Sequence, residues 1–287
     1  MGLIKNILFP VDFSPSCIAM GAYVKRAASM FGAGVSLIHV LDLASYSGLE
    51  LYVRPAAEIA EEHLEIARSK LDSFLREEFP ASEYPRILLS GDAATQIAQV
   101  ARNGFDLIIM PTHAGTFRRM LLGSTTAKVL DGADCPVSTS KHAETITPRP
   151  LEHREWLCAI GMGEDSERVL RYAHRASVEA RVNLHIIHAM QAADLRLPIQ
   201  LDIEEQIQSE ERQQVRKRLD DLQKRVGSRA SVRIAVGPVK EALLETAKQS
   251  DADVFIIGRS SQTGAHGRLR DLTYAMVRDS PFPVLSV

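Results

Sequence analysis

The chain has 287 residues, of which 45% are hydrophobic and 24% charged, and its formal net charge is −2. This length suits two domains, and the balanced charge gives no reason to expect nucleic acid or an anionic membrane surface as a partner. The three cysteines, at positions 17, 135 and 158, form no C-x-x-C pair, which argues against a disulfide framework or a structural zinc site.

The first residues enter a strand-like run at once, without the pattern of a signal peptide. No apolar run approaches the roughly 18 residues that a membrane-spanning helix needs. We therefore expect a cytoplasmic protein that does not associate with membranes.

In the first half, apolar runs typical of buried strands alternate with helical patterns. The first run ends at Asp12, and Ser14 with Pro15 provides an N-cap and first-turn pair for the following helix. Several strands are apolar throughout, which is typical of a parallel sheet covered on both faces. Strands are expected at residues 5–12, 34–42, 86–89, 106–110 and 135–139, and helices at 15–31, 60–74, 93–102 and 126–130.

The second half repeats this order of elements, with strands expected at residues 156–162, 182–190, 232–236, 253–258 and 281–285. Equivalent residues in the two halves are 146 to 149 positions apart, as in the pairs His39 and His188, Gly91 and Gly237, and Pro136 and Pro283. Such a register indicates an internal duplication. The sequence predicts a first domain at residues 1–141, a linker at 142–153 and a second domain at 154–287.

A stretch of the first half has the order expected of an anion pocket. The strand that ends at Met110 runs into a turn containing Gly115, and Gly123-Ser124-Thr125-Thr126 then opens a helix. The N-terminus of a helix offers unpaired amides and the positive end of a dipole, and hydroxyl groups add donors for phosphate oxygens. Ordinary helix capping would use the same residue types, so the pattern alone leaves both interpretations open.

With these residues considered together, the whole chain resembles a tandem universal stress protein, with two UspA-type domains in one polypeptide. The resemblance implies an α/β fold of two tandem five-stranded parallel-sheet sandwiches, Rossmann-like and similar to the adenine nucleotide alpha hydrolases. It also implies an ATP site at the carboxyl ends of the strands, possible Mg²⁺ with the nucleotide, and pairing of the two domains as an intramolecular pseudo-dimer through residues 136–140 and 283–287. Two chains could associate further as a homodimer.

The family's nucleotide signature is G-x-x-G, nine residues, then G-[S/T], with an Asp at the end of the first strand. The resemblance assigns Asp12 to the adenosine part of the nucleotide, Val40 to the adenine side, and the Gly-Ser-Thr-Thr group to the phosphates and ribose. The positions that it carries over as nucleotide-binding are Pro10, Val11, Asp12, Val40, Met110, Thr112, His113, Gly115, Gly123, Ser124, Thr125 and Thr126.

The sequence departs from this signature in both halves. Pro111 and Ala114 stand where the two loop glycines are expected, and eight residues, not nine, separate Ala114 from Gly123. In the second half Gly161 replaces the Asp, and Arg270-Asp271 replaces Gly123-Ser124, so we expect no nucleotide there. A universal stress protein scaffold without nucleotide is the first alternative.

An ATP-consuming transferase or slow ATPase is the second alternative, from the enzyme class. It would need a base or a metal-carboxylate pair near the phosphates, for which the sequence offers only Asp12 and His113. The pattern shows no nucleophile-base-orienter set and no metal-ligand cluster, so we expect slow ATP hydrolysis at most. His39 and His188 are expected to be buried structural residues, and His185 and His188, three apart on a strand, make a poor metal pair.

Overall fold

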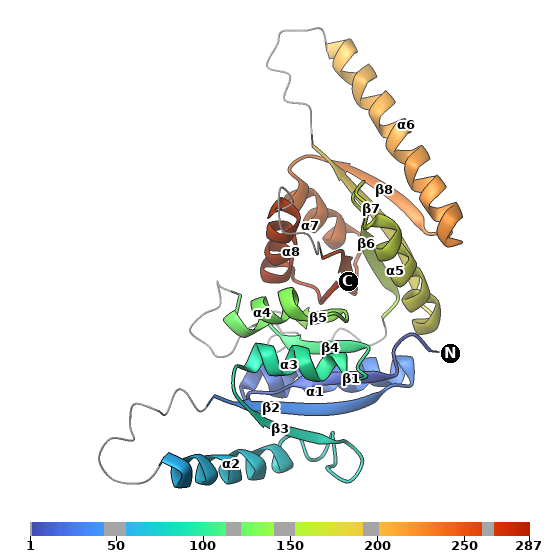
Figure 1. Ribbon diagram of the computed structural model, residues 1–287. Helices are drawn as coiled ribbons and strands as arrows, with labels where there is room; N and C mark the ends of the chain where they lie inside the picture. The colour runs from blue at the N-terminus through green and yellow to red at the C-terminus, as the bar shows by residue number, and fades with distance from the viewer. Residues whose placement is uncertain (1, 43–55, 113–121, 141–152, 192–200, 260–266) are drawn as a thin grey trace. The chain divides into compact units, whose positions relative to one another are not determined.

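The computed structural model describes residues 2–42, 56–112, 122–140, 153–191, 201–259 and 267–287 (Figure 1). Side chains are described for all of these residues except 56–57, 201–208 and 267–271. Contacts divide the chain into two compact units, Met1–Glu152 with Val277–Ser286, and His153–Met276 with Val287. The expected linker, residues 142–153, lies outside the described residues except for its last position.

The first unit is a sheet with strand order β3-β2-β1-β4-β5-β10. Neighbours are parallel from β3 to β5, and β10 pairs antiparallel with β5 through Val284↔Thr139 to Ser286↔Val137. The strands are β1 (Asn6–Pro10), β2 (Gly34–Leu41), β3 (Arg86–Ser90), β4 (Leu107–Pro111), β5 (Val137–Ser140) and β10 (Val284–Ser286). The helices are α1 (Pro15–Phe31), α2 (Ala56–Ser73), α3 (Ala93–Arg102) and α4 (Ser124–Gly132).

The second unit has a sheet with strand order β9-β6-β7-β8, and all of its neighbours are parallel. Its strands are β6 (Glu155–Ala159), β7 (Asn183–Met190), β8 (Ser231–Val236) and β9 (Val254–Ile257). The helices that follow them are α5 (Ser166–Ala180), α6 (Leu201–Val226), α7 (Val239–Gln249) and α8 (Gly267–Asp279). The expected α/β class is confirmed, and the described elements follow the predicted alternation.

Central strands of the first unit are buried on both faces, which explains their unbroken apolar sequence. Ile7, Leu8 and Phe9 of β1 and Ile108 and Ile109 of β4 are all 0% exposed. Helices on both sides must cover such strands, because apolar surface on either face would otherwise remain in water. The carboxyl ends of β1 and β4 are thereby held side by side.

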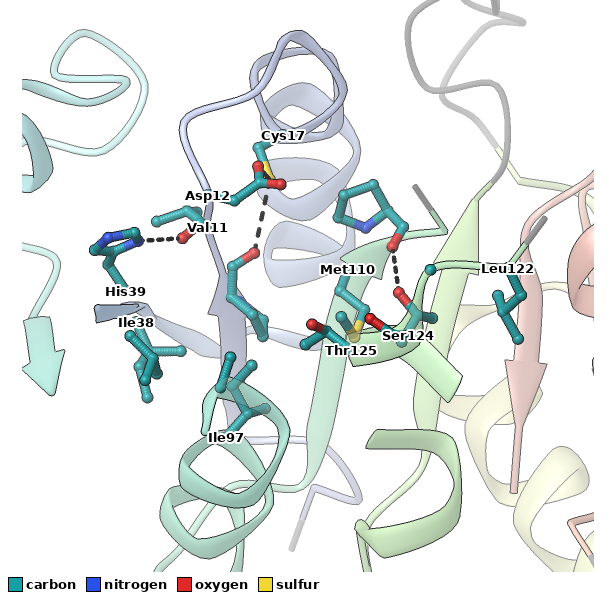
Figure 2. Close-up of a pocket in the computed structure, with 16 residues that line it drawn as sticks. Val11, Asp12, Cys17, Ile38, His39, Ile97, Met110, Leu122, Ser124 and Thr125 are labelled. Carbon is teal, nitrogen blue, oxygen red and sulfur yellow. Dashed lines mark hydrogen bonds between the residues drawn. The ribbon is translucent and has the colours of Figure 1, made fainter. Parts of the chain in front are cut away.

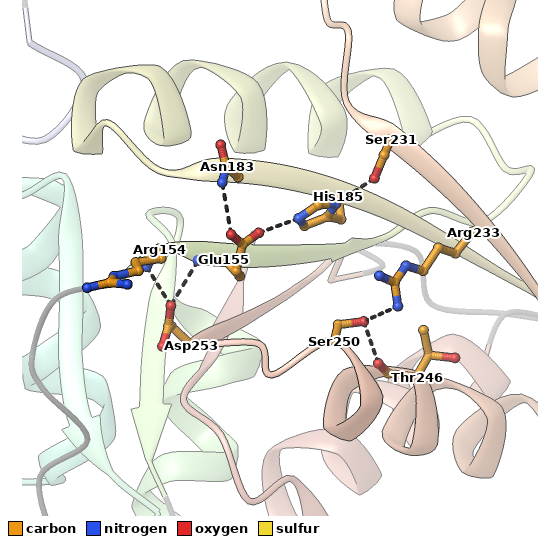
Figure 3. Close-up of polar contacts among 9 residues, drawn as sticks. All are labelled: Arg154, Glu155, Asn183, His185, Ser231, Arg233, Thr246, Ser250 and Asp253. Atoms are coloured by element: carbon orange, nitrogen blue, oxygen red, sulfur yellow. Dashed lines mark hydrogen bonds and ion pairs between the residues drawn. The ribbon is translucent and has the colours of Figure 1, made fainter.

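The expected duplication is visible in equivalent contacts as well as in equivalent elements. The Oδ2 atom of Asp106, just before β4, accepts hydrogen bonds from the backbone amides of residues 5 and 6. The Oδ2 atom of Asp253, just before β9, accepts the same pair of bonds from the amides of residues 154 and 155 (Figure 3). Each aspartate therefore fixes the start of the neighbouring central strand in its own unit.

Most predicted boundaries hold within two residues. The exceptions are the helix expected at 60–74, which begins at Ala56, and the strands expected at 156–162 and 281–285, which end at Ala159 and begin at Val284. The run predicted at residues 156–162 leaves the sheet after Ala159. Gly161 and Gly163 lie in the turn that follows, where the Ser166 hydroxyl oxygen lies 2.7 Å from both of their carbonyl oxygens and shares its one proton between them. The chain turns toward α5 there, so Met162 is exposed. No helix in the described ranges is long and apolar enough to cross a membrane.

Candidate functional site

A cavity of about 340 Å³ opens at the carboxyl ends of β1, β2 and β4 (Figure 2). Its volume lies in the range of small-molecule sites, and open α/β sheets place ligands at this end of their strands. The cavity is lined by nine of the predicted positions, namely Pro10, Val11, Asp12, Val40, Met110, Gly123, Ser124, Thr125 and Thr126.

The wall beside Asp12 is shaped by a residue with unusual backbone geometry. Phe13 has a φ of 63°, in the left-handed region that costs a non-glycine residue about 1–2 kcal/mol. Its ring packs against His39, with centroids 4.3 Å apart, and against Phe74, with centroids 5.4 Å apart. These contacts offset the strain and turn the chain sharply from β1 into α1. The turn leaves Asp12 exposed on the cavity wall.

Two hydrogen bonds fix the Asp12 carboxylate. Its Oδ1 atom accepts from the Ser14 amide at 3.0 Å and from the Cys17 thiol at 3.0 Å. The cap of α1 is Ser14, whose hydroxyl accepts from the Cys17 amide, as the sequence predicts. Because Ser14 caps the helix, Asp12 is available for another role, and its Oδ2 atom has no hydrogen bond to the described residues.

Cys17 is a lining residue to which the sequence analysis gave no role in the site. Burial, followed by the negative charge of Asp12, raises the pKa of the Cys17 thiol far above its usual value. The thiol therefore stays protonated at neutral pH, where it serves as a donor to Asp12 and is a poor nucleophile. A cysteine three residues after an N-cap gives no sequence signal for this contact.

The opposite wall is the N-terminus of α4. Gly123 is the N-cap and makes no side-chain capping bond, so a ligand can reach the first amides of the helix. Two hydrogen bonds hold the start of this helix against the end of β4. The backbone amide of Gly123 donates to the Thr112 carbonyl at 3.0 Å, and the Thr126 hydroxyl donates to the Pro111 carbonyl at 3.2 Å. Pro111, one of the departures from the family signature, thus provides one of the two carbonyl acceptors that hold the start of α4.

The base of the cavity is apolar except for one histidine. The His39 ring, half-buried rather than fully buried as expected, makes a hydrogen bond of 2.8 Å between Nδ1 and the backbone oxygen of Val11. This bond ties β2 to the end of β1 and supports the predicted structural role. The lining residues that the sequence analysis did not assign to a site are Cys17, Ile38, His39, Ala93, Ile97, Pro111 and Leu122.

Three predicted positions do not appear in the cavity wall. Thr112 is 1% exposed, and its hydroxyl donates to the Ser140 carbonyl at 3.4 Å, away from the lining. His113 and Gly115 lie outside the described residues. Within those residues no group of three or more His, Cys, Asp or Glu side chains could hold a metal ion.

Comparison with known proteins identifies the family. The model of the universal stress protein family matches the chain twice, at residues 3–140 and 154–287. The chain belongs to the universal stress protein family. Its two matches divide it as the duplication does, so it is a tandem UspA-type protein.

Individual relatives each resemble about half of the chain. Universal stress protein MJ0577 of Methanocaldococcus jannaschii is 29% identical over 153 residues, covering 48% of this chain and 94% of its own. Universal stress protein A homolog 2 of Coxiella burnetii is 32% identical over 135 residues, covering 46% of this chain and 92% of its own.

A solved structure resembles the whole chain. A universal stress protein from Archaeoglobus fulgidus covers 98% of this chain and 95% of its own, with a TM-score of 0.66 at 20% identity. At this identity the likeness shows the fold, which agrees with the two-domain α/β architecture of the universal stress protein described above.

A second polar cluster in this universal stress protein lies at the amino ends of the strands in the second unit (Figure 3). Glu155 is the first residue of β6, and its carboxylate accepts a hydrogen bond from the side-chain amide of Asn183 at 2.8 Å. The carboxylate also contacts Nε2 of His185, and Nδ1 of the same ring lies 2.5 Å from the Ser231 hydroxyl oxygen. This order of serine, histidine and carboxylate went unnoticed in the sequence. The residues of this cluster lie at the end of the strands opposite to the carboxyl ends and line no cavity described for either unit, so we interpret the cluster as a cross-strand row that ties β6, β7 and β8 together.

Replacing Glu155 with glutamine should lower stability in a pH-dependent way. Burial raises the pKa of Glu155, but hydrogen bonds from Asn183 and His185 outweigh it and leave the pKa below its usual 4.5. A carboxyl group with a depressed folded-state pKa stabilises the fold above its unfolded pKa, and this contribution disappears as the pH falls through the folded value. In urea unfolding, Glu155→Gln should be less stable than the wild type at pH 7, and the difference should shrink below pH 4.5.

Glu211, an exposed carboxylate on α6, provides the control for this measurement. Glu211→Gln should unfold like the wild type at both pH values. An effect of Glu155→Gln that is the same at pH 7 and at pH 3.5 would contradict the role given to the ionised carboxylate.

Proposed function

We propose that this protein is a cytoplasmic stress-response regulator that binds ATP in the cavity of its first unit. The observation that carries the proposal is the pairing of two features across one cavity: a fixed carboxylate at Asp12 and an uncapped helix N-terminus at Gly123. A carboxylate accepts hydrogen bonds from ribose hydroxyls, and helix amides donate to phosphate oxygens. Apolar side chains between them suit a purine ring.

The proposed ligand fits the residues at both ends of the cavity. Asp12 has a carboxylate oxygen without a partner among the described residues, and Ser124 and Thr125 add hydroxyl groups beside the helix amides. Mg²⁺ would enter with the ATP phosphates, since the described residues supply no cluster of metal ligands of their own. Among the described residues, Asp12 is the single carboxylate in the cavity wall, which supports binding with slow hydrolysis at most.

The two units are proposed to pair as an intramolecular pseudo-dimer, with a homodimer as a further level of assembly. The place of β10 supports this proposal, because the last strand of the second family match lies in the first unit and pairs there with β5, the last strand of the first match. Sedimentation equilibrium of the full chain measures whether two copies associate.

Replacing Asp12 with alanine should weaken ATP binding about tenfold. The substitution removes one hydrogen-bonded contact with the ligand, which contributes roughly 1.4 kcal/mol to the binding free energy. Isothermal titration calorimetry with ATP and Mg²⁺, and separately with AMP, measures the change. Asp134→Ala provides the control, because Asp134 is an exposed carboxylate of the same unit that pairs with Arg102.

The outcomes of this titration separate the proposals. Absence of binding heat with the wild-type protein would contradict nucleotide binding and favour the scaffold without nucleotide. Equal affinity in Asp12→Ala would contradict only the placement of the nucleotide. Turnover of ATP well above slow hydrolysis would favour the transferase alternative.

A further inference from the structure

The second unit has a cavity of its own, of about 320 Å³, at the carboxyl ends of β6, β7 and β9. It is the structural counterpart of the first cavity. The His188 ring contacts the Ile160 carbonyl at 2.7 Å, as His39 contacts Val11, and the Ile160 amide donates to the Ile187 carbonyl at 2.9 Å. The duplicated fold has therefore kept the hollow in both units.

The residues at the adenosine end differ between the two cavities. Gly161 takes the place of Asp12, and the carboxylates of this lining, Glu164 and Asp165, come three and four residues later in the chain. Val239 and Leu243 stand where the first cavity has Ala93 and Ile97. This part of the wall therefore carries larger aliphatic side chains, and the volume of the cavity is similar.

The phosphate end differs as well, because α8 begins earlier than α4. Thr273 corresponds to Thr126. The Thr273 hydroxyl donates to the Gly258 carbonyl at 3.1 Å, as the Thr126 hydroxyl donates to the Pro111 carbonyl at 3.2 Å. Yet α4 begins at Ser124, two residues before its threonine, whereas α8 begins at Gly267, six residues before.

This difference removes the free amides from the second cavity. The first four amides of a helix lack intrahelical acceptors, and for α8 these belong to residues 267–270. The residues that correspond to Ser124 and Thr125 are 271 and 272, whose amides fall within the hydrogen-bonded part of α8. Leu272 contributes an apolar side chain where the first cavity has Thr125.

The charges at the mouth do not favour an anion either. Glu164 and Asp165 line it, and they are opposed by Arg259 in the lining and by Arg168, which donates to Asp165 at 3.5 Å. Within the described residues, the two carboxylates therefore balance the two arginine charges, and no net positive charge remains at the mouth to attract a polyphosphate.

We propose that the cavity of the second unit binds an uncharged, largely apolar small molecule, and not a nucleotide. A preformed cavity of this size, lined mostly by apolar side chains with its charged residues at the mouth, favours such a ligand, because each apolar group that enters it leaves water. The proposal does not depend on ATP binding in the first unit. The two sites would allow one chain to hold two ligands of different chemistry.

The neutral fluorescent probe N-phenyl-1-naphthylamine tests this proposal on the full chain, since its emission rises when it leaves water. Wild-type protein should bind it saturably, with one probe per chain. Ala189→Trp should lose this binding, because residue 189 lines the second cavity and a tryptophan side chain would fill it. Val40→Trp, the equivalent change in the first cavity, should retain it.

Excess ATP should leave the probe in place, and Ala189→Trp should bind ATP like the wild type, which also shows that the variant is folded. Absence of saturable probe binding by the wild type, displacement of the probe by ATP, or loss of probe binding in Val40→Trp but not in Ala189→Trp would each overturn the proposal. Saturable probe binding by the wild type and its loss in Ala189→Trp are measured without ATP, so the two proposals can fail separately.

Discussion

Val40→Trp should abolish ATP binding while leaving the fold intact. Val40 lies near the end of β2, is half-buried and lines the first cavity. An indole at this position would occupy the space proposed for the adenine ring. Because the side chain points into a cavity rather than into the packed core, the added volume should displace ligand rather than neighbouring side chains.

Calorimetry with ATP and Mg²⁺ measures this effect, and circular dichroism melting checks the fold. Ala189→Trp provides a matched control, since it makes the same large substitution at the equivalent position of the second unit. ATP binding by Val40→Trp at wild-type affinity would show that the nucleotide does not use the first cavity.

Much of the fold could be predicted from the sequence, because its determinants are local. Apolar runs such as Ile7 to Phe9 must be buried on both faces, and Ser14, Gly32 and Asp92 are caps whose chemistry is readable in the residue itself. The duplication added independent evidence for each predicted helix and strand, because the equivalent segment of the other half had to show the same type of element. Boundaries were less certain where glycines loosen the chain, as after Ala159.

The candidate site was predictable only where it follows the family pattern. Asp12, Gly123, Ser124 and Thr125 stand at fixed positions in the sequence of elements, and all four line the cavity. The donor from Cys17 to Asp12 depends on the left-handed turn at Phe13, which composition and periodicity do not indicate.

The second cavity was also beyond the sequence, for a different physical reason. A hollow is a property of packing, and the residues that border it come from elements far apart in the chain. The replacement of Asp12 by Gly161 predicts loss of nucleotide binding but says nothing about whether the space itself persists. The retained contacts of His188 and Thr273 keep that space open.

Thr126→Val and Thr273→Val should separate the structural role of this threonine from its role in binding. Each side chain is 3% exposed, and each hydroxyl donates to a strand-end carbonyl, so each substitution leaves that carbonyl without its side-chain donor. The expected cost is about 1–3 kcal/mol of unfolding free energy in either variant. Urea unfolding measures it.

Only Thr126→Val should also weaken ATP binding in calorimetry. In the first unit the threonine belongs to the first turn of α4 and holds the uncapped amides against β4, whereas in the second unit it lies well inside α8. Equal loss of ATP affinity in both variants would contradict the assignment of the nucleotide to the first unit alone. Unchanged affinity in both would mean that the start of α4 is positioned by the Gly123 contact with Thr112, without help from the hydroxyl.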